Sequence, residues 1–107
     1  MAVKAFSVIF LESATADILD VYRWVYDVSR DPATAERFTA RLMASCRRIG
    51  DAPYGGRQRD DLFQGLRIMP FEKRAVIAYL IDGDTVVITN VFYGGRDYES
   101  LLRDGGE

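Results

Sequence analysis

AVIAYLIDGDTVVITNVFYGGRD, residues 75–97, contains two apolar, β-branched runs, Ala75–Ile81 and Thr85–Tyr93, joined by Asp82-Gly83-Asp84. Asp-Gly between alternating hydrophobic residues predicts a tight β-hairpin, because Gly accepts the positive φ that such turns demand. Both faces of the two runs are mostly apolar, so we expect the hairpin to lie centrally in a sheet covered on at least one side. An isolated hairpin is marginally stable in water, so the rest of the chain must supply the covering elements.

The sequence before this hairpin predicts one strand and two helices. We expect a strand over Val3–Leu11, a helix over Ala14–Ser29 and a second helix over Ala33–Ile49. The boundary signals are Ser13 and Asp31 as N-caps, Pro32 as the first residue of the second helix and Gly50 as its stop. The short join between the helices predicts an antiparallel helical hairpin.

The remaining segments complete an α+β domain. We expect a loop over Asp51–Asp61, a strand over Leu62–Pro70, a turn over Phe71–Arg74 and a short helix or tail over Tyr98–Arg103. The order is β-α-α-β-β-β, which predicts a two-layer fold with an antiparallel sheet packed against the N-terminal helical hairpin. A length of 107 residues predicts a single domain over residues 1–107.

Composition excludes several classes of chemistry. The chain has no histidine and only one cysteine, Cys46. A histidine-based triad, a histidine metal site, a thiol protease and a structural zinc site are therefore excluded or implausible, and we expect no metal and no cofactor. A lone cysteine suits a reducing cytoplasm. No apolar run has the roughly 18–20 residues that cross a bilayer, and the N-terminal segment is interpreted as a strand and not a signal peptide.

Charge is distributed unevenly along the chain. Residues 37–74 carry nine basic and four acidic side chains, whereas residues 1–36 carry three basic and six acidic ones and residues 75–107 two basic and six acidic ones. A basic middle segment is compatible with contact to nucleic acid or to an acidic protein. It is equally compatible with a solvated helix face.

Arginine and tyrosine are the candidate functional side chains. A shared surface of arginines and a lysine would bind phosphates, stabilise a transition state or pair with a partner's carboxylates. The alternative is that most of these side chains are solvated and the tyrosines pack at edges. The residues concerned are Arg57, Arg59, Arg67, Lys73, Arg74, Arg96, Tyr54, Tyr93 and Tyr98.

Four short stretches resemble the ParE branch of the RelE/ParE toxin superfamily, the toxins of type II toxin–antitoxin pairs. They are Ala14-Thr15-Ala16-Asp17-Ile18, Gly56-Arg57, Gly65-Leu66-Arg67 and Gly94-Gly95-Arg96-Asp97. They occur in the family's order over residues 3–102, nearly the whole chain. One departure is Tyr93, which stands where the family often has a histidine before the last motif.

The resemblance implies a cytoplasmic, plasmid-stabilising toxin that inhibits DNA gyrase and is neutralised by a ParD-like antitoxin. RelE-type relatives are instead ribosome-dependent mRNA endonucleases, and the alternative site here would combine Arg67, Arg74, Tyr93 and Arg96. Such a nuclease needs a base, and arginine stays protonated. Because the sequence offers only Lys4 and Lys73 as lysines, we favour the non-enzymatic gyrase interpretation, without direct nucleic-acid binding. A plain interaction module without toxic activity is the third alternative.

The expected contacts follow from position. Val21, Trp24 and Val28 form a second apolar stripe on the first helix, which we expect an antitoxin to cover together with Arg57, Arg67 and Arg74. Strand alternation predicts that Leu66 lies in the core and Arg67 on the opposite, open face of the sheet. Arg96 and Tyr98, just after the hairpin, are predicted to contact the target. For Asp97, capping of the following turn is the structural alternative.

Overall fold

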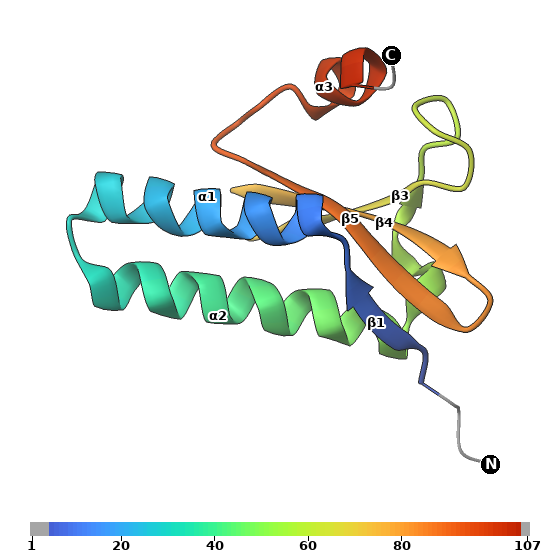
Figure 1. Cartoon of the computed structure of the whole chain (residues 1–107), viewed down its shortest axis with the longest axis horizontal. Helices are drawn as coiled ribbons and strands as arrows, with labels where there is room; N and C mark the ends of the chain where they lie inside the picture. Colours follow the sequence, from blue (N-terminus) through green and yellow to red (C-terminus); the bar gives the residue numbers. More distant parts are fainter. Residues whose placement is uncertain (1–4, 106–107) are drawn as a thin grey trace.

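The computed structural model describes residues 5–105. Its helices are α1 (Glu12–Ser29), α2 (Pro32–Arg48) and α3 (Tyr98–Gly105), with short 3₁₀ turns η1 (Ile49–Asp51) and η2 (Pro53–Gly55). Its strands are β1 (Ser7–Phe10), β2 (Arg57–Gln58), β3 (Arg67–Phe71), β4 (Ala75–Asp82) and β5 (Thr85–Tyr93). This α+β order confirms the predicted fold class, with α1 and α2 forming an antiparallel hairpin (Figure 1). No helix in the described part of the chain is long and apolar enough to span a membrane.

The sheet is mixed and not wholly antiparallel. Its five strands have the order β1-β5-β4-β3-β2, and β1 runs parallel to β5, with Ser7 opposite Thr85. The predicted β4–β5 hairpin is present and central. Parallel strands cannot be joined by a tight turn, and here α1, α2 and strands β2–β4 separate β1 from β5 along the chain.

Two predicted boundaries are wrong for local reasons. The strand predicted over Leu62–Pro70 begins only at Arg67, because Gly65 has a φ of 83° and its N–H binds Asp60 at 2.7 Å. The predicted start at Val3 of the first strand lies outside the described residues. Gly50 does not stop α2 but lies in η1, where a Cβ would come within 2.5 Å of the Phe6 carbonyl oxygen.

The start of α1 is tied to a bulge in β5. Ala78 pairs with Asn90 but Tyr79 pairs with Ile88, so Thr89 has no partner residue on β4. Asp17 accepts the backbone N–H of Val91 at 2.9 Å and the side-chain amide of Asn90 at 3.1 Å. Ser13, predicted as the N-cap, instead donates its hydroxyl to the Thr89 carbonyl at 2.6 Å, and α1 begins at Glu12.

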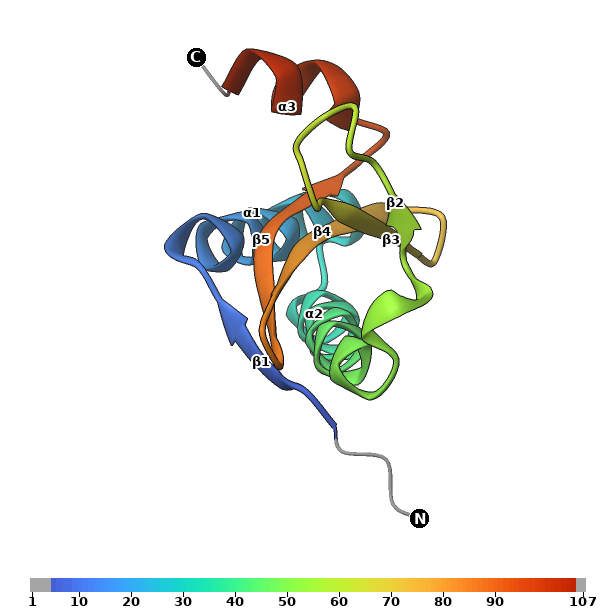
Figure 2. The ribbon, with the colours of Figure 1, turned by 90° about the vertical axis from the view of Figure 1, so that its right-hand side faces the viewer.

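The two faces of the sheet carry two separate cores. The larger core lies between the sheet and the α1–α2 hairpin and includes Val21, Leu42, Ile77, Tyr79 and Ile88, all fully buried. The smaller core lies on the other face, where α3 covers it; Figure 2 shows α3 and α2 on opposite sides of the strands. Its members are Leu66, Ile68, Ala78 and Phe92, against which Leu62, Val76, Leu80, Tyr98 and Leu102 pack.

Leu66 is buried as predicted, with an exposed fraction of 2%. The predicted assignment of faces is reversed, because Leu66 belongs to the smaller core under α3. Arg67 pairs with Tyr79, whose ring is in the larger core, so Arg67 is on the side of the helical hairpin. There is therefore no open sheet face beneath Arg67.

Candidate functional site

The turn between β3 and β4 consists of charged residues, two of which have a strained backbone conformation. Glu72 and Lys73 have φ values of 50° and 57°, and the N–H of Arg74 binds the Phe71 carbonyl at 3.0 Å. These features are those of a type I′ turn, whose central positions favour Asn and Gly. For residues with a Cβ the left-handed conformation costs roughly 1–2 kcal/mol each. Arg41 of α2 holds the turn through two hydrogen bonds to the Glu72 carboxylate, at 2.9 and 3.0 Å.

Beside this turn, three side chains from two distant segments form a stack. The Arg96 guanidinium lies 4.6 Å from the centre of the Tyr93 ring and donates to its hydroxyl at 3.1 Å. The Tyr93 ring in turn packs against Trp24 of α1, with 5.3 Å between ring centres. Gly94 and Gly95, with φ values of 67° and 75°, turn the chain so that Arg96 returns over Tyr93.

Three concavities meet at Arg74. A cavity of about 380 Å³ lies between the adjoining ends of α1 and α2 and the β3–β4 turn, and we call it the hairpin pocket. Shallower hollows of about 510 and 160 Å³ lie beside it, lined by the same turn and by the segment after β5. Arg74 lines all three.

This end of the molecule, which we call the turn end, is strongly basic. It is defined by Arg37, Arg41, Lys73, Arg74 and Arg96, and Glu72 is the one acidic residue among the described residues that line the three hollows. The Arg41 hydrogen bonds hold the pKa of Glu72 below its ordinary value, so Glu72 is ionised and neutralises Arg41. Within residues 5–105, the side chains of Arg37, Lys73 and Arg74 make no hydrogen bond or ion pair. A protein with a net charge of −2 thus presents a local excess of positive charge at this end.

The structure brings together three of the four residues of the predicted nuclease site. Arg74, Tyr93 and Arg96 line one hollow at the turn end. Arg67 is at the other end of β3, about 13 Å along the strand from Phe71. Its guanidinium donates to the carbonyl oxygens of Tyr54 and Gly56, at 3.1 and 2.9 Å, and stacks on the Tyr54 ring. Arg67 therefore fastens the loop before β2 instead of joining the other three.

The predicted antitoxin contacts are spread over the molecule. Val21 is fully buried in the larger core, so its assignment to a contact surface is wrong. Trp24 is half-buried in the stack, whereas Val28 is 70% exposed at the hairpin pocket. Arg57 is exposed on the edge strand β2, away from the turn end. The helical periodicity correctly predicted that Val21, Trp24 and Val28 lie along one stripe of α1. It could not predict that the sheet buries Val21 and leaves Val28 exposed.

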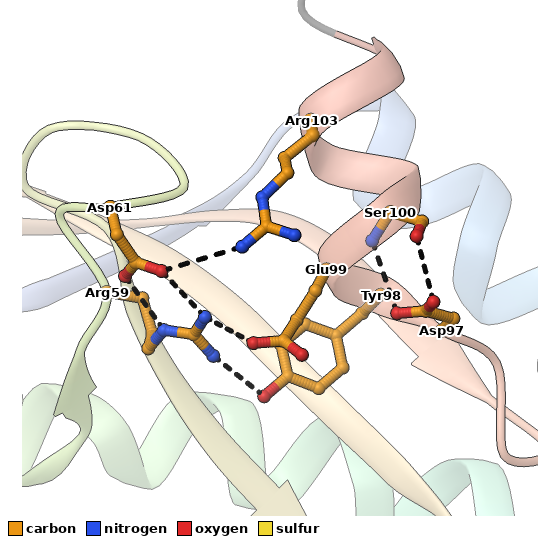
Figure 3. Close-up of polar contacts among 7 residues, drawn as sticks. All are labelled: Arg59, Asp61, Asp97, Tyr98, Glu99, Ser100 and Arg103. Atoms are coloured by element: carbon orange, nitrogen blue, oxygen red, sulfur yellow. Dashed lines mark hydrogen bonds and ion pairs between the residues drawn. The ribbon is translucent and has the colours of Figure 1, made fainter.

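A second polar cluster, which sequence reasoning did not assign, fastens α3 to the smaller core (Figure 3). Arg59 has an exposed fraction of only 8% and donates to Asp61 at 2.9 and 2.8 Å, to Glu99 and to the Tyr98 hydroxyl at 3.3 Å. The hydrogen bonds from Arg59 lower the pKa of Asp61 to about 2. No spacing in the sequence distinguishes Arg59 from its neighbours. We call Arg59, Asp61, Tyr98 and Glu99 the α3 cluster.

Asp97 and Tyr98 have structural tasks. Asp97 accepts the backbone N–H of Ser100 at 3.2 Å and its hydroxyl at 2.8 Å, which caps α3 as the structural alternative predicted. The Tyr98 ring packs on Phe92, with 6.0 Å between ring centres, and its hydroxyl meets Arg59. A target contact by Tyr98 would have to use what remains exposed of this ring.

The larger core contains the only thiol and a buried phenol, neither placed for chemistry. Burial raises the pKa of the Cys46 thiol to about 12, which leaves it protonated at neutral pH. The Tyr79 hydroxyl donates to the Pro53 carbonyl at 2.8 Å and accepts the Gly56 N–H at 2.9 Å. A Cβ at Gly56 would be 2.3 Å from this hydroxyl, which explains the glycine of Gly56-Arg57. No group of metal-ligating side chains occurs among the described residues.

Comparison with known proteins gives one family and a shared fold. Residues 8–98 match the family model described as the ParE toxin of the type II toxin–antitoxin system parDE. No curated protein matches the chain. A solved structure of the chromosomal ParDE toxin–antitoxin system from P. aeruginosa is similar, with a TM-score of 0.71 and 18% identity over 83% of this chain and 96% of that one. The toxin–antitoxin complex RelBE2 from Mycobacterium tuberculosis has a TM-score of 0.61 and 18% identity over 85% of this chain and 100% of that one. At this identity the two structures show the fold alone.

Proposed function

The chain belongs to the ParE toxin family of type II toxin–antitoxin systems, and on this premise we propose that it inhibits DNA gyrase and thereby replication. We further propose that a ParD-like antitoxin neutralises it, and that both act in the cytoplasm. The family match over residues 8–98 carries this proposal.

The turn end supports a role in protein contact. Arg74 and Arg96 are exposed, permanently charged and located at one end of the sheet, which suits recognition of carboxylates on a protein target. Arg96 is the residue we propose to contribute most, because its stacking on Tyr93 and Trp24 limits the orientations of its guanidinium. Tyr98 is proposed as a minor target contact beside it.

A second candidate function is the mRNA endonuclease activity of RelE-type toxins. One observation favours it: Arg74, Tyr93 and Arg96 share one hollow, and two guanidinium groups would stabilise a pentacoordinate phosphate. The chemistry also needs a group that activates the ribose hydroxyl, and arginine serves poorly as a base. Lys73 is the nearby candidate, exposed on the strained turn.

Expression of the toxin without antitoxin separates the two functions. We expect DNA synthesis to stop and gyrase-linked DNA breaks to accumulate, and we expect the purified protein to inhibit supercoiling by gyrase. Rapid arrest of translation with cleaved mRNA and normal supercoiling would instead establish the nuclease. Normal growth would contradict both functions and leave an interaction module.

A further inference from the structure

The β3–β4 turn has a backbone conformation that its own residues do not favour. Glu72 and Lys73 both have left-handed φ values, of 50° and 57°, where hairpin turns of this type normally have Asn and Gly. A left-handed backbone at residues with long side chains persists only where the surroundings hold it, and such strain concentrates at functional sites. We therefore expect contacts from outside the turn to keep it in place.

Two side chains on adjacent turns of α2 hold the β3–β4 turn at two consecutive residues. The Phe38 ring packs edge-on against Phe71, with 5.5 Å between ring centres. The Arg41 guanidinium lies 5.5 Å from the centre of the Phe38 ring and donates to both oxygens of the Glu72 carboxylate, at 2.9 and 3.0 Å. An exposed ion pair ordinarily contributes little, but two parallel hydrogen bonds and a stacked guanidinium restrict the geometry of this one.

The turn is also bonded to the segment that carries Arg96. The Arg74 N–H donates to the Phe71 carbonyl at 3.0 Å, which closes the turn. The Arg74 carbonyl accepts the N–H of Gly94 at 3.1 Å, so the backbone of the turn is joined to the first residue after β5. Gly94 begins the pair of left-handed glycines that brings Arg96 back over Tyr93. A displaced turn would therefore remove the anchor of the segment that orients Arg96.

We propose that Arg41 is a positioning residue for Arg96. Its guanidinium fixes the Glu72 carboxylate, the carboxylate fixes the strained turn, and the turn fixes Gly94 ahead of the arginine. Arg41 needs no contact with the target in this role. Because Arg96 is the target contact assigned under the proposed function, the inference rests on that function for its effect on activity. The positioning itself is measurable on the protein alone.

Amide hydrogen exchange tests the positioning on the wild type, on Arg41→Ala, and on Arg41→Ala combined with either Glu72→Gly or Glu72→Gln. Both changes at position 72 remove the same charge, but only glycine adopts the left-handed φ without strain. In Arg41→Ala we expect exchange at the Arg74 and Gly94 amides to accelerate at least about tenfold, with unchanged exchange in the middle of β4 and β5. The combination with Glu72→Gly should restore slow exchange, and the combination with Glu72→Gln should not.

Inhibition of gyrase supercoiling by the same proteins should follow the same order. We expect Arg41→Ala to inhibit at least about tenfold more weakly than the wild type, the Glu72→Gly combination to recover to within about threefold, and the Glu72→Gln combination to remain weak. Arg47→Ala, which removes an exposed arginine near the other end of α2, should inhibit as the wild type does. Each protein is assayed well below its melting temperature, so that loss of folded protein does not account for a difference.

Unchanged exchange at Arg74 and Gly94 in Arg41→Ala would overturn the proposal, because the ion pair would then not hold the turn. Equal recovery with Glu72→Gly and Glu72→Gln would also overturn it, since Arg41 would supply charge and not backbone geometry. Slow exchange without recovered inhibition in the Glu72→Gly combination would instead make Arg41 a direct target contact.

A variant that keeps the charge covers the case in which Arg41→Ala lowers the melting temperature. Arg41→Lys cannot form two parallel hydrogen bonds to Glu72, so it should accelerate exchange at the same two amides. Hydrogen exchange is measured without gyrase. A wild type that leaves supercoiling unaffected would therefore contradict the proposed function alone, and exchange would still decide the positioning role of Arg41.

Discussion

Arginine has a different role in each of the two polar regions of this molecule, the α3 cluster and the turn end. In the α3 cluster, Arg59 is almost inaccessible and its donors are taken by Asp61, Glu99 and Tyr98. At the turn end, Arg37 and Arg74 are exposed and make no hydrogen bond to a side chain among the described residues, although each attracts a nearby carboxylate, Asp31 and Glu72 respectively. A satisfied, buried guanidinium holds elements together, whereas an exposed and uncommitted one is available to a partner. The environment and not the residue type therefore separates structure from function.

The largest expected effect is on the smaller core beneath α3. Leu66→Ala should lower the free energy of unfolding by about 2–5 kcal/mol, because it leaves a cavity at a site that is 2% exposed. Urea denaturation measures this loss. Toxicity per folded molecule should stay unchanged, and a specific loss of toxicity at unchanged stability would place function on the α3 side.

Removing the centre of the α3 cluster should loosen α3 without unfolding the larger core. Arg59→Ala deprives Asp61 and Glu99 of their common donor, so the melting temperature should fall, though less than in Leu66→Ala. Hydrogen exchange should become faster in α3 and remain slow in β4 and β5. Unchanged exchange in α3 would show that the cluster does not hold the helix.

The same cluster predicts an acid sensitivity. The pKa of Asp61 falls from its ordinary 3.8 to about 2 in the folded protein, chiefly through its hydrogen bonds to Arg59. The resulting stabilisation is fully present above about pH 4 and is lost as the pH falls through about 2. Asp61→Asn should lower the free energy of unfolding at pH 7 and make its decline between pH 4 and 2 less steep. Urea denaturation at each pH measures this free energy. If the free energy of unfolding of the variant fell with pH as steeply as that of the wild type, Asp61 would not be the source of the acid sensitivity.

The fold was predictable where the signals are local. Asp82-Gly83-Asp84 predicted the β4–β5 hairpin, and Gly83 indeed has a φ of 61°. Asp31 and Pro32 predicted the start of α2, where Asp31 accepts the Ala33 N–H at 3.2 Å. The parallel pairing of β1 and the Asp17 clamp on the β5 bulge join residues more than 70 positions apart. No local pattern encodes such contacts.

The candidate site was predictable only in part. The position of Arg96 just after the predicted hairpin indicated that this residue stands at the end of the sheet. It could not indicate that Trp24 completes the stack with Arg96 or that Arg67 is occupied by loop carbonyls. The burial of Arg59 depends on α3 folding back over the sheet, so the sequence could not separate it from the free arginines.

The smallest expected effect on stability is also the most informative about function. Arg96→Ala should leave the free energy of unfolding within about 0.5 kcal/mol of the wild type, as for exposed positions generally. Arg47→Ala, at an exposed arginine near the other end of α2, is the matched control.

Inhibition of gyrase supercoiling by purified wild-type protein and these two variants, each with an unchanged melting temperature, tests most directly whether the turn end carries the function. We predict that the wild type and Arg47→Ala inhibit supercoiling, whereas Arg96→Ala is folded but inactive. Full inhibition by folded Arg96→Ala would contradict this assignment.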